Sequence, residues 1–235
     1  MTVLHEALAP YIRKEKREEK GREKIVEVLR HPLLPARDYE AQFNALYGRE
    51  LQVKQIDLEM AELTRNWGKT IWLHERPFRA TALQNIADKM TDAQYWALVA
   101  EVWIDAGDTY AERERWTQIW TSTRPYRDHV MTVDEHKALA QIPDDQITIY
   151  RGCLRGTEQG LSWSLNKNDA RVVAARLVGQ PVLVTGTVDK RRIQAFFSGR
   201  PNRKEDEVVV LPRHVRRVAV NETPGSRVRV LQAAE

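Results

Sequence analysis

The spacing of hydrophobic and polar positions changes near residue 145. Before this point apolar residues recur at helical intervals, and after it they alternate as they do in strands. One helical pattern covers residues 38–66. A second helix is predicted to begin at a capping box of Thr91 with Gln94 and to stop by Gly107. The apolar positions that define the first of these patterns are Phe43, Leu46, Leu51, Ile56, Met60 and Leu63.

The remaining segments before residue 145 also read as helical. Residues 11–30 mix Lys, Arg and Glu so evenly that we predict a solvated helix, and not a nucleic-acid patch. A further capping box, Thr132 with Glu135, predicts a short helix that Pro143 ends. Six of the seven Trp lie between residues 67 and 120. Aromatic residues at helical spacing form cores far more often than cofactor sites, so we predict that they are buried.

The C-terminal part is predicted to be strands with one helix. The helix covers residues 167–178, with Asn166 at its start and Gly179 after its end. One helix among six or seven strands predicts an α+β fold and not a doubly wound sheet. The predicted strands are residues 146–151, 160–165, 181–189, 192–197, 207–212, 215–220 and 227–232.

The amino-acid composition indicates which classes of protein are possible. With 42% hydrophobic and 30% charged residues the chain has the composition of a soluble globular protein. The single Cys153 excludes an internal disulfide, and no stretch approaches eighteen apolar residues, so no membrane partner is expected. The N-terminus shows no secretory signal. We expect the protein in the cytoplasm, either where it is made or in a host cell after delivery.

The net charge of +4 is distributed unevenly between the N-terminal and the C-terminal parts of the chain. Residues 1–145 hold 21 Lys and Arg against 25 Asp and Glu, whereas residues 146–235 hold 16 against 8. Thirteen of those 16 cations are Arg, which suits bidentate contacts to phosphate. The C-terminal part therefore carries a charge of +8, which fits either a solvated basic face or an anionic ligand.

The sequence lacks the motifs of several common enzyme classes. The six His are scattered without metal-binding spacing, and we expect no metal site. No Gly-rich phosphate loop occurs, and the Gly-Leu-Ser-Trp-Ser segment at 160–164 is not a nucleophile elbow. These absences count against kinases, Rossmann dehydrogenases, zinc hydrolases and α/β-hydrolases.

Three short motifs follow one another in the C-terminal part. The first strand contains Tyr-Arg-Gly at 150–152, the second carries Ser-x-Ser at 162–164, and a later strand opens with Glu-x-Glu at 205–207. Each motif alone is weak. Their order, with a helix and two strands between the second and the third, is much rarer by chance, and alternation puts both Ser on one side and both Glu on one side of their strands.

In these motifs the chain from Gln146 onward resembles mono-ADP-ribosyltransferases of the Arg–Ser–Glu type, which include bacterial toxins and phage-encoded modifiers. The resemblance implies that NAD is the substrate and that a split β-sandwich forms the catalytic domain. The change of spacing predicts a helical region over 1–145, which carries no motif of the family, and the resemblance implies that 91–145 packs on a catalytic domain over 146–235. The middle residue of the Ser motif, Trp163, departs from the usual Thr, but alternation points it away from the site.

By this resemblance the NAD-binding residues are Arg151, Gly152, Ser162 and Ser164. Arg151 holds the phosphates, the Gly152 backbone receives the nicotinamide amide, and Ser162 braces the catalytic Glu207.

The family also implies how the second substrate is held. Glu205 faces the acceptor, and a Glu-x-Glu motif goes with arginine of a target protein. The acceptor-recognition loop contains Phe196, Phe197 and Arg200, and one of the two Phe is expected to stack on the incoming guanidinium. The alternatives left open are a nucleic-acid acceptor, NAD hydrolysis, an inactive binding module and an unrelated α+β adaptor.

Overall fold

The computed structural model describes residues 6–19, 21–143, 145–200 and 206–222. Helices and two antiparallel sheets make up these residues, which confirms the α+β class. The chain forms two compact units. One comprises residues 1–91 with 105–107, and the other comprises residues 92–104 with 108–235. The division thus lies near Thr91, whereas the change of period in the sequence lies near residue 145.

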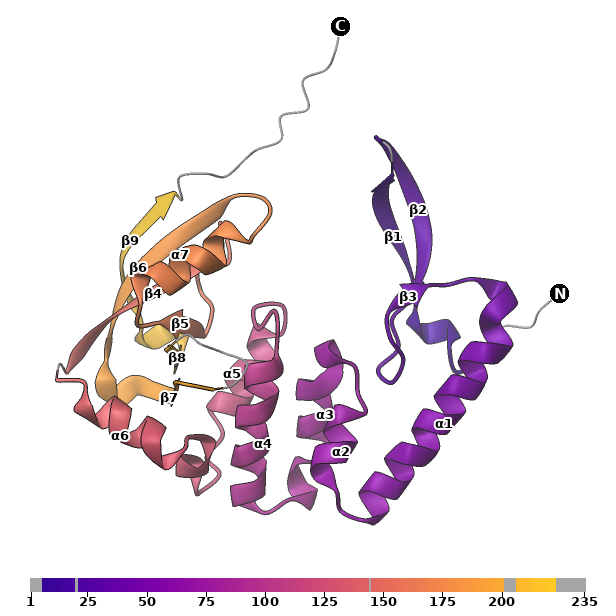
Figure 1. The fold of residues 1–235 in the computed structure, drawn as a ribbon, viewed down its shortest axis with the longest axis horizontal. Helices are drawn as coiled ribbons and strands as arrows, with labels where there is room; N and C mark the ends of the chain where they lie inside the picture. The colour runs from indigo at the N-terminus through magenta and orange to yellow at the C-terminus, as the bar shows by residue number, and fades with distance from the viewer. Residues whose placement is uncertain (1–5, 20, 144, 201–205, 223–235) are drawn as a thin grey trace, which may run out of the picture. The chain divides into compact units, whose positions relative to one another are not determined.

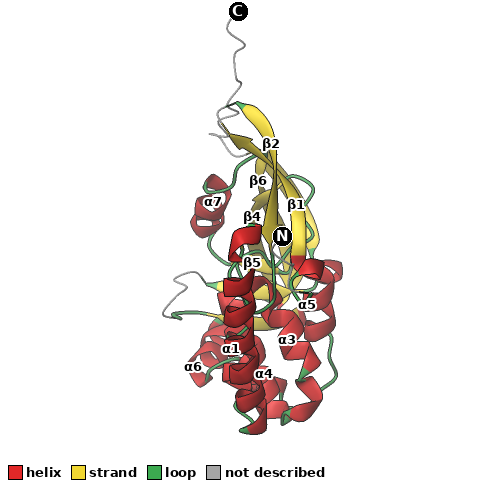
Figure 2. Cartoon of the chain, turned by 90° about the vertical axis from the view of Figure 1, so that its right-hand side faces the viewer, coloured by secondary structure: helices red, strands yellow, loops and turns green. Residues whose placement is uncertain are grey.

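The first unit begins with a β-hairpin where we predicted a helix. Strands β1 (Ile12–Glu19) and β2 (Arg22–Leu29) pair antiparallel, and the short β3 (Arg37–Asp38) joins them (Figures 1 and 2). The predicted helix over 11–30 is therefore wrong. Gly21, with φ of 76°, directly precedes β2, and a glycine with positive φ is typical of a tight hairpin turn. Lys and Glu alternate in a way that also matches cross-strand ion pairing, as between Lys16 and Glu23 (3.0 Å).

Helix α1 (Asn44–Leu63) lies within the predicted helical segment 38–66 but buries a different face. Its Leu51 packs with Leu29 and Leu34 in the core of the first unit. The other five predicted apolar positions are 41–78% exposed, so the predicted stripe is not the core face: Phe43, Leu46, Ile56, Met60 and Leu63. Helices α2 (Trp67–Trp72) and α3 (Arg79–Asn85) complete this unit and pack on each other.

The second unit begins with helices α4 (Asp92–Asp105), α5 (Arg113–Trp120) and α6 (Val133–Gln141). Trp96, Trp103, Trp116 and Trp120 are fully buried and contact one another edge to face or tilted. The prediction of an aromatic core is confirmed for these four rings, whereas Trp72 of the first unit is 37% exposed and contradicts it. The capping box of Thr132 and Glu135 at the start of α6 is also confirmed.

The second unit also contains a six-stranded antiparallel sheet, counted over the described part of the chain, in the order β7-β8-β5-β4-β6-β9. The strands described from Gln146 onward all belong to this one sheet, so the two facing sheets of a split sandwich are not seen within them. The predicted strand over 227–232 lies outside the described residues. The strands are β4 (Gln146–Leu154), β5 (Ser162–Ser164), β6 (Pro181–Asp189), β7 (Ile193–Phe197), β8 (Glu207–Val210) and β9 (Arg216–Glu222).

The two faces of this sheet have different coverings. One face carries the apolar core, in which Ile149, Trp163 and Val208 lie and against which Leu139 of α6 packs. Helix α7 (Lys167–Ala175) lies across β4 and β6 on the other face (Figure 1). It begins as predicted, because the Asn166 side chain caps it by accepting a hydrogen bond from a backbone N–H.

Candidate active site

The Ser strand and the Glu strand are neighbours in the sheet. Ser164 of β5 stands opposite Glu207 of β8, so both side chains and that of Ser162 project from the same face. The Ser162 hydroxyl donates a hydrogen bond to Oε1 of Glu207. Glu207 is only 4% exposed. The predicted bracing of a strand-mounted carboxylate by a serine is thus present as a contact.

Arg151 reaches this site from the opposite face of β4. Its neighbours by alternation, Ile149 and Cys153, lie in the apolar core. The guanidinium Nη1 donates to the Ser162 backbone oxygen at 2.8 Å, and Nε is buried without a partner among the described residues. Burial lowers the pKa of Arg151. At least one of its donors therefore stabilises the Ser strand and is not available to a phosphate.

Gly160 shows how closely this guanidinium is packed. A Cβ atom built on Gly160 would lie 2.2 Å from Cζ of Arg151. The chain leading into β5 therefore passes directly against the arginine, and a side chain at Gly160 would require the guanidinium to move.

Gly152 and Ser164 also lie at the site but are occupied by local contacts. The side of Gly152 that lacks a Cβ faces α7, where a Cβ would lie 2.0 Å from the Ala170 oxygen. The Ser164 hydroxyl accepts from the Asn166 N–H at 2.9 Å and donates to the Asn166 oxygen at 3.0 Å. Both residues thus support the start and the packing of α7.

A pocket opens where these residues meet α7. Its cavity volume is about 60 Å³, well below the roughly 300–1,000 Å³ of small-molecule sites. A dinucleotide therefore does not fit inside the pocket as it stands. The pocket is lined by Tyr150, Arg151, Gly152, Ser162, Trp163, Ser164, Asp169, Ala170, Val173 and Glu207.

Sequence reasoning missed two acidic residues near Arg151. Asp169 lines the pocket from the first turn of α7. The pKa of Arg151 is lowered by burial, and the nearby negative charge of Asp108 offsets part of that lowering. An Asp in a first helical turn normally signals only a favourable helix-dipole contact, so no motif distinguishes Asp169. Asp108 precedes Arg151 by more than forty residues, and only folding brings the two near each other.

The predicted acceptor residues do not form an open surface. Phe196 and Phe197 are 3% and 1% exposed, so the expectation that one of them is free to stack on an acceptor is wrong. Phe196 belongs to the apolar core, and the guanidinium above the Phe197 ring, 5.4 Å from its centroid, is that of the chain's own Arg200. Glu205, the predicted acceptor carboxylate, lies outside the described residues.

Within the described ranges, no group of three or more His, Cys, Asp or Glu side chains is gathered closely enough to hold a metal ion. Among the helices that the structure describes, none combines the length and the apolar character needed to cross a bilayer.

A scan against protein-family models, a search of curated proteins and a search of solved structures each found no match for this chain.

Proposed function

We propose that the chain is an NAD-dependent mono-ADP-ribosyltransferase that modifies arginine of a target protein. The observation that carries the proposal is the buried Glu207 carboxylate, held by the Ser162 hydroxyl in a pocket that Arg151 also lines. The adjacency of the three motif strands, in the order β8-β5-β4, supports an ADP-ribosyltransferase-like catalytic domain.

The chemistry of NAD explains why a carboxylate is needed and an acid is not. The bond between the nicotinamide nitrogen and ribose C1′ breaks with both electrons going to nicotinamide, which leaves as a neutral molecule. The ribose then resembles an oxocarbenium ion, as in glycoside hydrolysis. A fixed carboxylate beneath it stabilises the developing positive charge, and Glu207 is fixed by its strand and by Ser162.

The acceptor completes the reaction by attacking C1′. A guanidinium is a poor nucleophile until it loses a proton, and we assign the acceptance of that proton to Glu205 of the Glu-x-Glu motif, which lies outside the described residues. Arg151, whose Nη1 is bound to the Ser162 backbone oxygen, adds positive charge beside the pocket and not a free two-pronged contact to a diphosphate.

A second candidate function is NAD hydrolysis, in which water takes the place of the arginine. The burial of Phe196 and Phe197 and the internal pairing of Arg200 favour it, because these residues then offer little to a protein acceptor.

The test is to incubate the purified chain with NAD, with and without agmatine as a small guanidine acceptor. Released nicotinamide, free ADP-ribose and ADP-ribosyl-agmatine are measured separately. Glu207→Gln, which keeps the volume and removes the charge, is expected to slow nicotinamide release about 100-fold or more. The control Glu101→Gln removes an exposed carboxylate from α4 of the same unit and is expected to change nothing.

The products separate the two candidates. ADP-ribosyl-agmatine identifies transfer, and free ADP-ribose alone identifies hydrolysis. Turnover by Glu207→Gln within a few-fold of wild type, or no turnover by the wild-type chain, would reject the proposal.

A further inference from the structure

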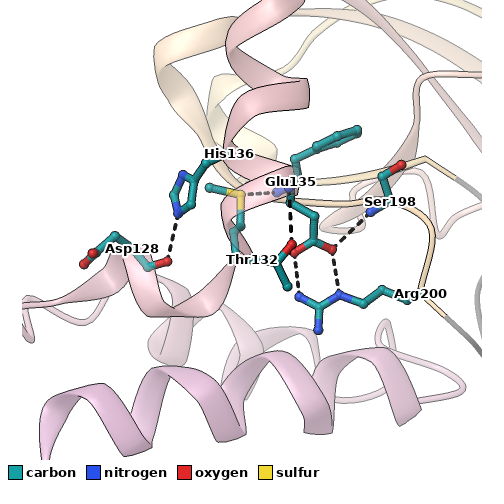
Figure 3. Close-up of polar contacts among 8 residues, drawn as sticks. Asp128, Thr132, Glu135, His136, Ser198 and Arg200 are labelled. Atoms are coloured by element: carbon teal, nitrogen blue, oxygen red, sulfur yellow. Dashed lines mark hydrogen bonds and ion pairs between the residues drawn. The ribbon is translucent and has the colours of Figure 1, made fainter.

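A second buried carboxylate lies outside the pocket, on helix α6. Glu135 is 2% exposed, and Figure 3 shows it between the start of α6 and the chain that follows β7. A carboxylate at such depth is unfavourable unless it is paired and hydrogen-bonded. Its partners therefore show what the fold uses it for.

Glu135 accepts four hydrogen bonds from two separate segments. On its own helix it accepts from the Thr132 N–H at 2.7 Å, which completes the capping box. From the other segment it accepts the Ser198 N–H at 3.2 Å and two bonds of 2.6 Å from the Arg200 guanidinium. Burial alone would raise the pKa of Glu135, but the bonds from Arg200, Thr132 and Ser198 outweigh it, and the pKa lies below its ordinary value.

The segment that Glu135 holds is joined directly to the strand of Glu207. The Ser198 hydroxyl donates to the Asp206 carboxylate at 2.6 Å, and the Asp206 backbone oxygen accepts from the Leu165 N–H at 3.0 Å. Asp206 is adjacent to Glu207 in sequence. On the other side, Phe197 stands opposite Glu207 in the β7–β8 pairing.

A helix cap alone does not account for this arrangement. The capping box needs only Thr132 and Glu135. The Arg200 fork and the Ser198 N–H belong to a segment more than sixty residues later, and they bind both oxygens of the same carboxylate. The additional bonds hold Ser198 and Arg200. Ser198 is adjacent in the chain to Phe197, the cross-strand partner of Glu207, and donates to Asp206, its chain neighbour.

We propose that Glu135 is a positioning residue for Glu207, holding residues 198–200 against α6 and thereby fixing where β8 begins. The effect on catalysis rests on the proposed function, whereas the effect on the backbone does not. A small displacement of a catalytic group costs about 10- to 100-fold in rate.

The principal variant is Glu135→Gln. Glutamine also completes a capping box, so the helix start is kept while the charge that pairs with Arg200 is removed. We expect kcat for nicotinamide release to fall about 10-fold or more with little change in KM for NAD. The matched control is Asp134→Asn, which removes an exposed charge from the same helical turn and should leave kcat unchanged.

A second variant keeps the test valid if Glu135→Gln does not fold. Arg200→Lys keeps the positive charge but cannot form the two-pronged contact, and it is expected to produce the same loss of kcat. Because both changes break one interaction, the double variant is expected to lose little more than either single variant.

Hydrogen exchange measured by mass spectrometry makes the test independent of turnover. Glu135→Gln should speed exchange in peptides covering 197–200 and 206–210, relative to wild type and to Asp134→Asn. Faster exchange in both peptides together with the loss of kcat supports the positioning role. Unchanged exchange there, or unchanged kcat in an active enzyme, overturns it. If the wild-type chain has no turnover, the proposed function fails, while exchange still decides whether Glu135 holds this segment.

Discussion

Gly152→Ala is expected to destabilise the second unit strongly for a change of one methyl group. A Cβ at this position would lie 2.0 Å from the Ala170 oxygen, 2.6 Å from the Ala174 nitrogen and 3.0 Å from the Ala174 Cβ. Ordinary contacts of a Cβ lie at 3.4–4 Å. Two of the three atoms belong to the backbone of α7, which has no rotamer to change, so the helix itself has to move by more than about 1 Å.

The magnitude follows from this geometry. Overpacking in a core typically costs about 1–3 kcal/mol, and contacts with helix backbone place Gly152→Ala at the upper end. Each kcal/mol shifts the melting temperature of a domain of this size by about 2–4 °C, so a fall of roughly 5–10 °C is expected. Since Ala170 lines the pocket on the displaced helix, NAD turnover should fall as well.

Scanning calorimetry measures the shift, and hydrogen exchange in β4 and α7 assigns it to the second unit. The control is Gly107→Ala, because the nearest atom to a Cβ there is 4.0 Å away and the backbone conformation suits any residue. If both the Gly152 and the Gly107 variants have the melting temperature of the wild type, α7 does not pack on β4 as described. The assignment of α7 to the wall of the pocket would then be wrong as well.

Two further predictions concern buried polar groups. Trp103→Phe should lower the free energy of unfolding by about 1 kcal/mol less than Trp96→Phe does. The Trp96 indole N–H donates to the Pro125 oxygen at 2.9 Å, whereas that of Trp103 has no partner among the described residues. Urea unfolding that ranks the two variants equally or in reverse contradicts this prediction. The pKa of Glu135 lies below its ordinary 4.5, so the stability from its pairing with Arg200 is complete above pH 4.5 and is lost as the pH falls through the folded value. The difference in unfolding free energy between wild type and Glu135→Gln should therefore shrink in acid, and a difference that is constant or grows there would refute the pairing.

Local patterns predicted the second sheet well. The six described strands from Gln146 onward lie where alternation placed them, and Asn166 begins α7 as its capping preference indicated. The prediction that Trp163 points away from Ser162 is also confirmed, because alternation along a strand follows from backbone geometry alone. The roles of the site residues stay predictions.

The hairpin over residues 12–29 shows where local patterns are ambiguous. A run of Lys, Arg and Glu contains few apolar residues, so it carries no period that separates helix from strand. The cross-strand ion pairs and the turn at Gly21 stabilise the hairpin. Of these, only the glycine could be recognised in the sequence.

Alternation along each strand was enough to place both Ser of 162–164 on one side and both Glu of 205–207 on one side of their strands. That Ser162 braces Glu207 was implied by the family resemblance, and the pairing of β5 with β8 is seen only in the structure. The sequence did not show that Phe197 is buried, that Gly152 must lack a side chain, or that Glu135 pairs with Arg200. Each of these depends on which distant segment covers a given surface. Burial and pairing are set by those neighbours in space, and they exist only once the helices have packed against the sheet.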